Sequence, residues 1–572
     1  MQFLLVSLLT LLTFVLLFTF RSADDNRLTS WQYVFNEGSP VTAFVVLLVC
    51  MSGALFFPKL SFSVRFPSLL LFISSFAAAA FFWEVPEVIV DASRYFTQAK
   101  HLELYGFGYF FREWGRAIHC WTDLPLVPFL YGVIFRFCGE SRVYVQVFTS
   151  ALFSMTVVLT YLIGRELWDE ETGLLGGALL LGMPYLFSQV PLMLVDIPTM
   201  FFLTLAIFTF MKGAGGGNWM MVWATASLCL ALLSKYSAWP MLSVLAVIVA
   251  LHVAPVPWEE GKKYFRRSVL IAVAALAVSG LLVLSKYEVF LGQLRVLMTF
   301  QGPGLRKWGE SFLSTFFFQV HPFITVAALF SIIAALRKKD LRYAVVAWLV
   351  VIMIVFQVKR IRYSLPLFPM VALMASYGLQ QVRDREVRRF IVLCVLASSL
   401  TVAVVCYRPF LERISTVNLK SAGEFLNRLE GETAEVYALP QEGAGVNPAV
   451  VVPLLDLYTK KNIIYRYDAA LLPHEEGTEM SPLRFTWEYA NPRYYGKDRE
   501  EEGESVPVVI VSGGPVETLP REIQTRLNGY RVLREFNAYE GIFTFRTTVT
   551  VYSRFGVAKP PRMKAKLSVF ES

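Results

Sequence analysis

Long apolar runs recur through the first four hundred residues of this chain, and they constrain its fold more than any other feature. Runs of roughly 15–22 apolar residues follow one another from Met1 to Cys406. A helix of about 20 apolar residues spans the hydrocarbon core of a bilayer. Only 17% of the 572 residues are charged, and the mean hydropathy is +0.52, which leaves too little polar surface for a soluble protein of this length. We therefore predict a mainly α, polytopic transmembrane helical bundle.

The apolar runs predict about thirteen spans. Residues 1–20 lack a basic segment at their start, which favours an uncleaved first helix, although cleavage near Ser22-Ala23 stays open. The run 124–138 is short for a span and has an arginine near its end, so we interpret it as a helix that lies in the membrane interface. The predicted spans are 1–20, 41–57, 67–83, 143–164, 173–190, 197–211, 219–233, 236–253, 268–285, 311–336, 343–358, 363–379 and 390–406.

Three basic loops orient the predicted bundle. Two predicted spans separate each loop from the next, so all three face one side, which the positive-inside rule assigns to the cytoplasm. Counting from them places the first large loop 84–142, the turn at Asp196, the loop 286–310, the turn 359–362 and everything after Cys406 outside. The basic residues are Lys262, Lys263, Arg266 and Arg267, then Arg337, Lys338, Lys339 and Arg342, and then Arg383, Arg385, Arg388 and Arg389.

The chain changes character after the last apolar run. Charge rises, and glycine and proline cluster at 442–445 and 513–515. The segment 421–429 has the pattern of an amphipathic helix, 506–513 that of a buried strand, and 541–555 alternates like one or two strands. The sequence thus predicts a transmembrane domain over 1–406 and an extracytoplasmic α/β domain over 407–572, which ends in a flexible tail from Lys559.

Several other kinds of site are not indicated. The six cysteines fall mostly in apolar runs and have no CxxC or zinc-ligand spacing, so we interpret them as buried small apolar side chains. The net charge of +9 sits largely in short loops, and no basic stripe with interleaved aromatic residues predicts nucleic-acid binding. The glycine run 213–218 is interpreted as a turn rather than a phosphate loop.

Four charged residues at predicted outer helix ends are candidates for chemistry: Asp91, Asp196, Lys235 and Arg362. Each also has an ordinary explanation, because the aspartates could cap helices and the two cations could extend to the interface. Together, however, two carboxylates and two cations from distant segments fall on one side at one depth. A site that removes a proton and stabilises a leaving phosphate needs such a set.

The order of several motifs resembles the membrane glycosyltransferases of the GT-C fold, in particular the protein O-mannosyltransferases and the lipid A aminoarabinose transferases. No single motif is specific, but together they follow the family order across 91–373. The matching pieces are DASRYFTQAKHL at 91–102, DLPLVPFLYGVIFRFCGESR at 123–142, YLIGRELWDEETGLLGGALLLGMP at 161–184, LVDIPTMFFLTLAIF at 194–208, LSKYSAWP at 233–240 and IRYSLPLFPMVAL at 361–373.

The resemblance implies a hexosyl or pentosyl transferase whose donor is a sugar on a polyprenyl phosphate. The acceptor would be a lipid, a glycan or a protein on the outer face of a plasma membrane, bacterial or archaeal. Asp91 matches the acidic residue of the first loop, which would be the general base, and Asp196 matches the second acidic position. Lys235 and Arg362 match basic positions that we assign to the donor phosphate, and Tyr95 and Tyr363 would shape the pocket. The resemblance makes no cofactor certain, and a divalent metal stays open.

The sequence also departs from the family. Many relatives have Asp-Glu where this chain has Asp91-Ala92, so a second carboxylate is missing there. The first large loop follows three predicted spans rather than one. Glu113, His119 and Asp123 are further candidates for polar groups. Two alternatives remain open: a transporter or flippase of lipid-linked glycans, and a non-catalytic relative that kept the fold. A transporter would be expected to carry charges along a path inside the bundle.

Overall fold

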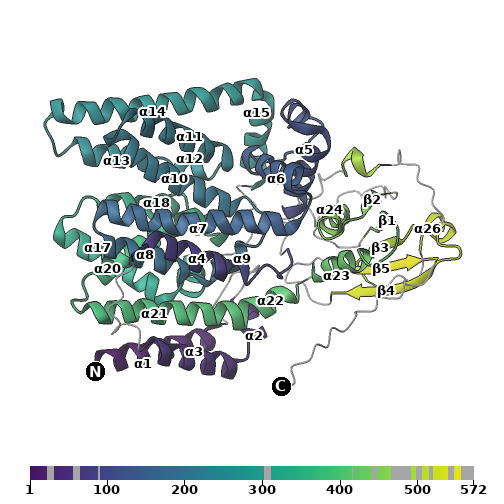
Figure 1. The fold of residues 1–572 in the computed structure, drawn as a ribbon, viewed down its shortest axis with the longest axis horizontal. Coiled ribbons are helices and arrows are strands. Elements are labelled where there is room, and N and C mark those ends of the chain that lie inside the picture. Colours follow the sequence, from purple (N-terminus) through teal and green to yellow (C-terminus); the bar gives the residue numbers. More distant parts are fainter. Residues whose placement is uncertain are drawn as a thin grey trace, which may run out of the picture. The chain divides into compact units, whose positions relative to one another are not determined.

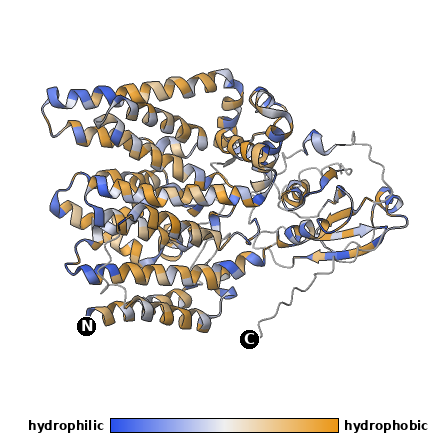
Figure 2. Ribbon diagram, viewed as in Figure 1, coloured by the Kyte–Doolittle hydropathy of each residue, from blue (hydrophilic) through white to orange (hydrophobic). Residues whose placement is uncertain are grey.

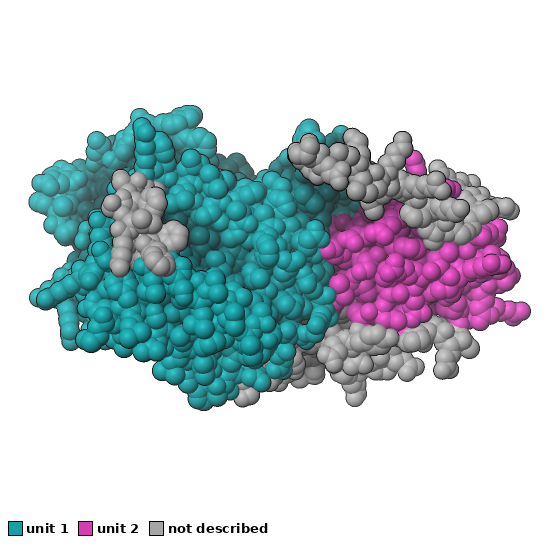
Figure 3. All heavy atoms as spheres, turned by 60° about the horizontal axis from the view of Figure 1, so that its bottom comes forward, with its two compact units in different colours: residues 1–413 teal, residues 414–572 magenta. Residues whose placement is uncertain are grey.

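The structure is a computed structural model, and it describes residues 1–21, 31–55, 65–87, 91–301, 311–414, 416–440, 447–465, 491–496, 506–514, 519–538 and 547–554. The predicted turn at 442–445 and the predicted tail lie outside these residues. Two compact units, Met1–Arg413 and Ile414–Ser572, are described separately below; Figure 3 distinguishes them by colour.

The described residues of the first unit are mainly helical, and each of the predicted apolar segments contains helix (Figure 1). The mainly α fold class is therefore confirmed. Its elements are α1 (Gln2–Thr19), α2 (Trp31–Glu37), α3 (Pro40–Ala54), α4 (Pro67–Ala80), α5 (Asp91–Glu113), α6 (Leu126–Cys138), α7 (Arg142–Leu167), α8 (Glu170–Leu181), α9 (Pro184–Gln189), α10 (Asp196–Gly215), α11 (Asn218–Ser234), α12 (Ala238–Met241), α13 (Val244–Val253), α14 (Trp258–Ser285), α15 (Tyr287–Val296), η3 (Leu297–Gln301), η4 (Ser314–Val320), α17 (Pro322–Lys338), α18 (Tyr343–Val355), α19 (Ile361–Ser364), η5 (Leu365–Leu367), α20 (Phe368–Leu379), α21 (Arg385–Val402), η6 (Ala403–Tyr407) and α22 (Arg408–Glu412).

Five helical stretches among the described residues are long and apolar enough to cross a membrane by themselves. These are α1, α7, α10, α14 and the continuous stretch from α21 to α22, whereas α3, α4, α6, α11, α18 and the α12–α13 pair are shorter apolar helices. Figure 2 shows the apolar colour along the helices and the polar colour gathered at their ends. The unit is therefore a membrane-spanning bundle, and the number of spans stays a prediction.

Helix breaks explain where the predicted segments differ from the structure. The segment 173–190 is interrupted after Leu181, because Pro184 begins α9 and cannot continue the hydrogen bonds of the preceding turn. The segment 236–253 is likewise divided into α12 and α13. The segment 286–310, which we expected to be a loop, instead begins with the amphipathic helix α15, whose Phe290 and Gln293 are buried.

Close packing holds the central helices together. α7 lies against α8, α10 against α11, and α17 against α20. At Gly173 in α8, a Cβ atom would collide with the backbone carbonyl of Tyr161 in α7. Glycine at such a position lets two helix backbones approach closely, as is common in membrane bundles.

The connectivity places the candidate residues at one end of the bundle. Asp196 begins α10 and Lys235 follows α11, so the antiparallel pair brings both to the same end. From Lys235 the chain passes through α12 and α13 to the turn before α14, whose first turns hold the basic residues that begin at Lys262. These basic residues therefore lie at the opposite end, where Figure 2 also shows the polar beginnings of α14 and α21.

Helices α5 and α6 form the first large loop and pack against each other. Gly106 adopts φ 79° and ψ 179°, a backbone conformation that favours glycine, and it kinks α5. α6 has 13 residues, a length of about 20 Å at the usual helical rise, which is shorter than a hydrocarbon core of about 30 Å. Beyond the kink, a buried cluster joins this loop to α15 through Phe110, Trp114, Ile118 and Phe290.

The second unit is built on a five-stranded sheet in the order β2-β1-β3-β5-β4. β2, β1 and β3 are parallel, and β5 pairs antiparallel with both β3 and β4. Helix α26 packs through Ile523 against Tyr437, Val508 and Ile510. The elements are α23 (Val417–Leu426), β1 (Thr433–Ala438), η7 (Pro448–Val450), α24 (Val451–Asp456), β2 (Asn462–Tyr465), η9 (Arg493–Tyr495), β3 (Val508–Ser512), α26 (Arg521–Arg526), β4 (Arg531–Asn537) and β5 (Thr548–Ser553).

Candidate active site

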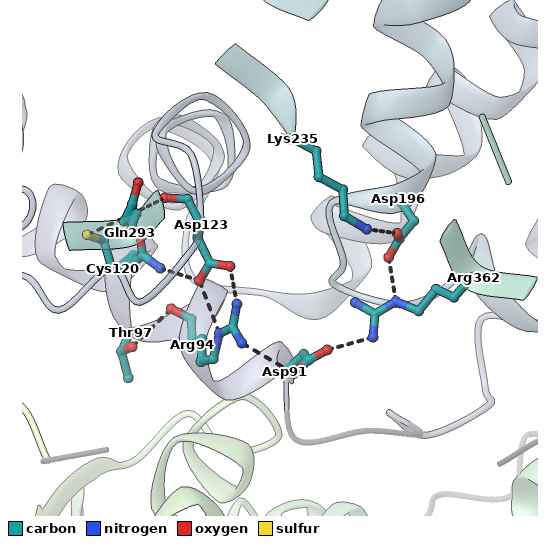
Figure 4. Close-up of polar contacts among 10 residues, drawn as sticks. Asp91, Arg94, Thr97, Cys120, Asp123, Asp196, Lys235, Gln293 and Arg362 are labelled. Atoms are coloured by element: carbon teal, nitrogen blue, oxygen red, sulfur yellow. Dashed lines mark hydrogen bonds and ion pairs between the residues drawn. The ribbon is translucent and has the colours of Figure 1, made fainter. Parts of the chain in front are cut away.

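Six charged side chains of alternating sign form a continuous line at one end of the helical bundle (Figure 4). They come from the beginning of α5, the turn before α6, the beginning of α10, the end of α11 and the short helix α19. We call this line the charge row. Its members, in order, are Lys235, Asp196, Arg362, Asp91, Arg94 and Asp123. With three cations and three carboxylates, the charge row is formally neutral.

Arg362 is the centre of the charge row. Its Nε donates to Asp196 Oδ2 at 2.6 Å, and its Nη1 donates to Asp91 Oδ2 at 2.6 Å. One guanidinium thus bridges two carboxylates through different nitrogens, which the planar fork of arginine allows and the ammonium group of lysine does not. Lys235 Nζ approaches the other side of Asp196, at 2.5 Å from Oδ1.

Arg94 extends the charge row from Asp91 to Asp123. Its Nη1 lies 3.6 Å from Asp91 Oδ1. Its Nε donates to Asp123 Oδ2 at 3.1 Å, and its Nη2 donates to Asp123 Oδ1. The pairing with Asp123 is therefore a two-point fork, whereas the approach to Asp91 is longer and involves one nitrogen.

Aromatic rings border the charge row. The ammonium of Lys235 lies 4.3 Å from the centre of the Tyr363 ring, and the guanidinium of Arg360 lies 5.6 Å from the same centre. The guanidinium of Arg94 lies 5.6 Å from the Tyr95 ring and 5.3 Å from the Trp121 ring. These distances suit cation–π attraction, which holds cations that would otherwise be hydrated.

The electrostatics of the charge row keep Asp91 ionised. Burial by itself would raise the pKa of this carboxyl, but the positive charges of Arg362, Arg94 and Arg360 and the hydrogen bond from Arg362 outweigh it and hold the pKa at about 2. The carboxylate side chain is 14% exposed, so solvent or a substrate group has access to it. Asp91 in this state is an anion with low proton affinity.

A second buried ion pair holds the segment that leads into Asp196. Arg142 Nε donates to Glu87 Oε1 at 2.9 Å, and Glu87 also accepts from the backbone N–H of Met193 at 3.3 Å. Arg142 donates further to the carbonyl oxygens of Trp83 and Pro191. The Glu87–Arg142 pair therefore ties the backbone after α4 to the backbone before α10.

The structure brings the predicted charged candidates together. Asp91, Asp196, Lys235 and Arg362 are all members of the charge row, although 271 positions separate Asp91 from Arg362. The capping interpretation of Asp196 is wrong, because α10 begins at Asp196 itself and no side chain caps it. The ammonium of Lys235 pairs with Asp196, and its position at the membrane interface stays a prediction.

The other predicted site residues differ in whether they contact the charge row. Tyr363 lies under Lys235, and Tyr95 is buried beside Arg94. Asp123 belongs to the charge row, whereas Glu113 pairs with the exposed Arg112. The His119 ring contacts the Trp121 ring, with 4.5 Å between their centres.

Sequence reasoning did not single out Arg94, Glu87 or Arg142. Arg94 is one helical turn from Asp91, a spacing that could have indicated an ion pair within α5. Glu87 lies outside a helix, and its partner Arg142 is 55 positions away, so no local pattern connects them.

Within the described part of the chain, no group of three or more His, Cys, Asp or Glu residues could hold a metal ion. Each carboxylate of the charge row lies instead beside at least one arginine or lysine. The oxygens that a divalent cation would use are thus already occupied by cationic partners in this arrangement.

Comparison with known proteins agrees with this architecture. The model of the family described as dolichyl-phosphate-mannose-protein mannosyltransferase matches residues 122–283. Among curated proteins, none matches the chain. The helical bundle has the architecture of the GT-C-fold membrane proteins.

Two solved structures share this fold. ArnT from Cupriavidus metallidurans in the apo state is 12% identical, with a TM-score of 0.54 over 84% of this chain and 97% of ArnT. The same protein bound to undecaprenyl phosphate is 12% identical, with a TM-score of 0.51 over 85% of this chain and 98% of ArnT. The chain thus has the GT-C fold and resembles the family of the protein O-mannosyltransferases and ArnT.

Proposed function

We propose that the protein transfers a sugar from a polyprenyl-phosphate donor to an acceptor on the outer face of the membrane. The observation that carries this proposal is the charge row, in which Asp91 is partly accessible and shares Arg362 with the buried Asp196. A phosphate ester needs cations to receive it, and an acceptor hydroxyl or amine needs a base. The charge row holds both kinds of group within one line.

In the proposed reaction, the acceptor oxygen or nitrogen attacks the anomeric carbon, and Asp91 takes the proton that it loses. The bond between the anomeric carbon and the phosphate oxygen breaks, and its electron pair stays with the phosphate. Lys235 and Arg362 stabilise the added negative charge on the leaving polyprenyl phosphate. Fixed cations in a poorly hydrated site stabilise such charge more than water does. Tyr363 would hold Lys235 in place beneath the phosphate.

The solved ArnT complex with undecaprenyl phosphate supports the class of donor, since that protein has the same fold and binds a polyprenyl phosphate. We further propose that the basic loops face the cytoplasm, so that the charge row and the second unit face outwards. The positive-inside rule supports this orientation.

The test is sugar transfer by the purified protein, given radiolabelled polyprenyl-phosphate sugars and a membrane extract as the source of acceptors. We expect Asp91→Asn to lower transfer by about 10²- to 10⁴-fold, as removal of a general base does, while donor binding remains. The matched control is Asp340→Asn, which removes a carboxylate that pairs with Arg342 at the opposite end of the bundle.

Equal transfer by wild type and Asp91→Asn would exclude Asp91 as the base and direct attention to Asp196. Absence of transfer with every donor, combined with movement of the donor across vesicle membranes, would favour a flippase. Absence of both transfer and movement would favour a non-catalytic relative.

A further inference from the structure

Arg94 contacts two carboxylates of the charge row unequally. Asp123 receives both Nε, at 3.1 Å, and Nη2, whereas Asp91 lies 3.6 Å from Nη1. Arg94 is three residues after Asp91 on α5, so the helix keeps its guanidinium within reach of Asp91. The position of Asp123 therefore decides how closely this cation engages Asp91.

Asp123 is held in place by contacts that the proposed chemistry does not use. Gln98 Nε2 donates to Asp123 Oδ2 at 3.1 Å. Gln293 Nε2 donates to the backbone oxygen of Asp123 at 2.9 Å, and the backbone N–H of Asp123 donates to the oxygen of Cys120 at 2.7 Å. Gln98 and Gln293 are buried, at 0% and 3% exposed. A carboxylate anchored by this many groups is a fixed counter-ion rather than a mobile one.

We propose that Asp123 is a positioning residue that holds the Arg94 guanidinium away from Asp91, so that Asp91 becomes an effective base once a donor phosphate draws Arg362 away. This inference rests on the proposed function. Before the donor binds, Arg362 is the close partner of Asp91, at 2.6 Å. A phosphodiester that recruits Arg362 and Lys235 competes with Asp91 for Arg362 and with Asp196 for both cations, since the charge row is already neutral.

The step that follows is balanced in atoms and charge. Asp91, released from Arg362, accepts the proton of the acceptor O–H or N–H while the acceptor bonds to the anomeric carbon. The electron pair of the broken carbon–oxygen bond goes to the phosphate, which Arg362 and Lys235 now hold. Donor binding thus changes Asp91 from a salt-bridge partner into a proton acceptor. Before the donor binds, the salt bridge with Arg362 keeps Asp91 from acting as a base towards water.

Charged and titratable groups face Asp91 from three segments of the chain. Arg362 and Arg360 approach from the segment around α19, Arg94 and Tyr95 lie on α5 itself, and Asp123 lies before α6. Arg360 contacts the Tyr363 ring. Arg94 and Arg362 each also pair with a second carboxylate, Asp123 and Asp196 respectively. The Asp123–Arg94 pair is varied because the proposed donor contacts do not use it.

The kinetic test compares wild type, Asp123→Asn, and the double variant Asp123→Asn with Arg94→Met. In Asp123→Asn the released Arg94 should engage Asp91. The pKa of Asp91 should then fall, because an opposite charge at close range lowers a carboxyl pKa by about 1–3 units. We expect the acidic limb of kcat to move down by about one unit and kcat at neutral pH to fall about three- to tenfold, with little change in donor KM. In the double variant the cation is gone, so the limb should return to its wild-type position or above it, and kcat should recover.

A purely structural role for Asp123 gives a different pattern. The double variant would then be at least as impaired as the single one, and the pH limb would stay in place. Either result overturns the role proposed for Asp123. If wild-type transfer is nevertheless strong, the proposed function stands and only this inference fails.

A second measurement needs no transfer activity. Arg362→Gln removes the close partner of Asp91 and so mimics its capture by phosphate. The Asp91 carboxylate is titrated by infrared spectroscopy, and its band is assigned as the one lost in the double variant Arg362→Gln with Asp91→Asn. The pKa of Asp91 should be higher in Arg362→Gln than in wild type. Adding Asp123→Asn should then lower that pKa by about one unit. Arg362→Met is the second background if the glutamine variant does not fold, and an unchanged Asp91 titration on adding Asp123→Asn overturns the inference.

Discussion

The charge row and the Glu87–Arg142 pair are both buried ionic groups built from distant segments, but they contact different kinds of partner. The contacts that link the members of the charge row join one side chain to another. Arg142 and Glu87 also bond to the backbone at Trp83, Pro191 and Met193. Arg362 and Lys235 bond to carboxylate side chains and can exchange these partners for a substrate, whereas Arg142 and Glu87 also bond to the backbone and so fix the fold. The comparison separates a group suited to chemistry from a group suited to support.

The largest expected effect comes from breaking the supporting pair. Removing one member of a buried ion pair costs about 3–5 kcal/mol, because the other charge stays buried without compensation. We expect Arg142→Met and Glu87→Gln to lower the free energy of unfolding by about this amount, measured as a loss of thermal stability in detergent. The control is Glu166→Gln, which removes the exposed partner of Lys212 and should change stability by about 0–1 kcal/mol. A stable Arg142→Met variant would contradict a supporting role.

Next in size is the effect of Arg362→Lys on transfer. Lysine keeps the charge but cannot bridge Asp91 and Asp196 through two nitrogens. We expect transfer to fall about 10²-fold, the size of effect seen when a fixed donor at a developing charge is lost. The melting temperature should change much less than in Arg142→Met. A variant that melts early but transfers normally per folded molecule would reverse the assignment of the two groups.

A smaller effect should appear in the pH dependence of stability. The pKa of Asp91 is about 2 in the folded protein, below the ordinary value of about 3.9 in an unfolded chain. Its stabilising contribution is therefore complete above about pH 5 and is lost as the pH falls through 2, about 3 kcal/mol in all. Thermal melts of wild type and Asp91→Asn between about pH 2 and pH 5 should differ in slope over this window. Parallel curves would show that Asp91 is not held at a low pKa.

The smallest expected effect is at Tyr363. Its ring lies under Lys235, and a cation–π contact at such a partly exposed site is worth about 0.5–1 kcal/mol. We expect Tyr363→Leu to raise the donor KM by about two- to fivefold, while Tyr363→Phe keeps the ring and changes it little. An equal effect of both substitutions would point to the hydroxyl group instead of the ring.

Much of the bundle and part of the charge row could be predicted from the sequence. Counting the predicted spans puts four charged residues at helix ends on the same side, so these could be predicted as candidates: Asp91, Asp196, Lys235 and Arg362. Arg94 was not singled out: its spacing from Asp91 indicates an ion pair within one helix, but its main partner Asp123 is 29 positions away and no local pattern connects them. Glu87 and Arg142 were hidden for a further reason: their roles depend on backbone groups of Trp83, Pro191 and Met193, whose positions follow from packing alone.

The spacing of the charge row along the chain has a consequence for biosynthesis. Asp91 leaves the ribosome 271 residues before Arg362, its closest partner. Until α19 has been made, Asp91 and Asp196 lack the arginine that bridges them in the complete chain. If the protein acts as proposed, we expect a chain that stops before Arg362, or that inserts its late helices in the wrong direction, to transfer no sugar. The bundle must therefore be assembled as far as α19 before the proposed sugar transfer can begin.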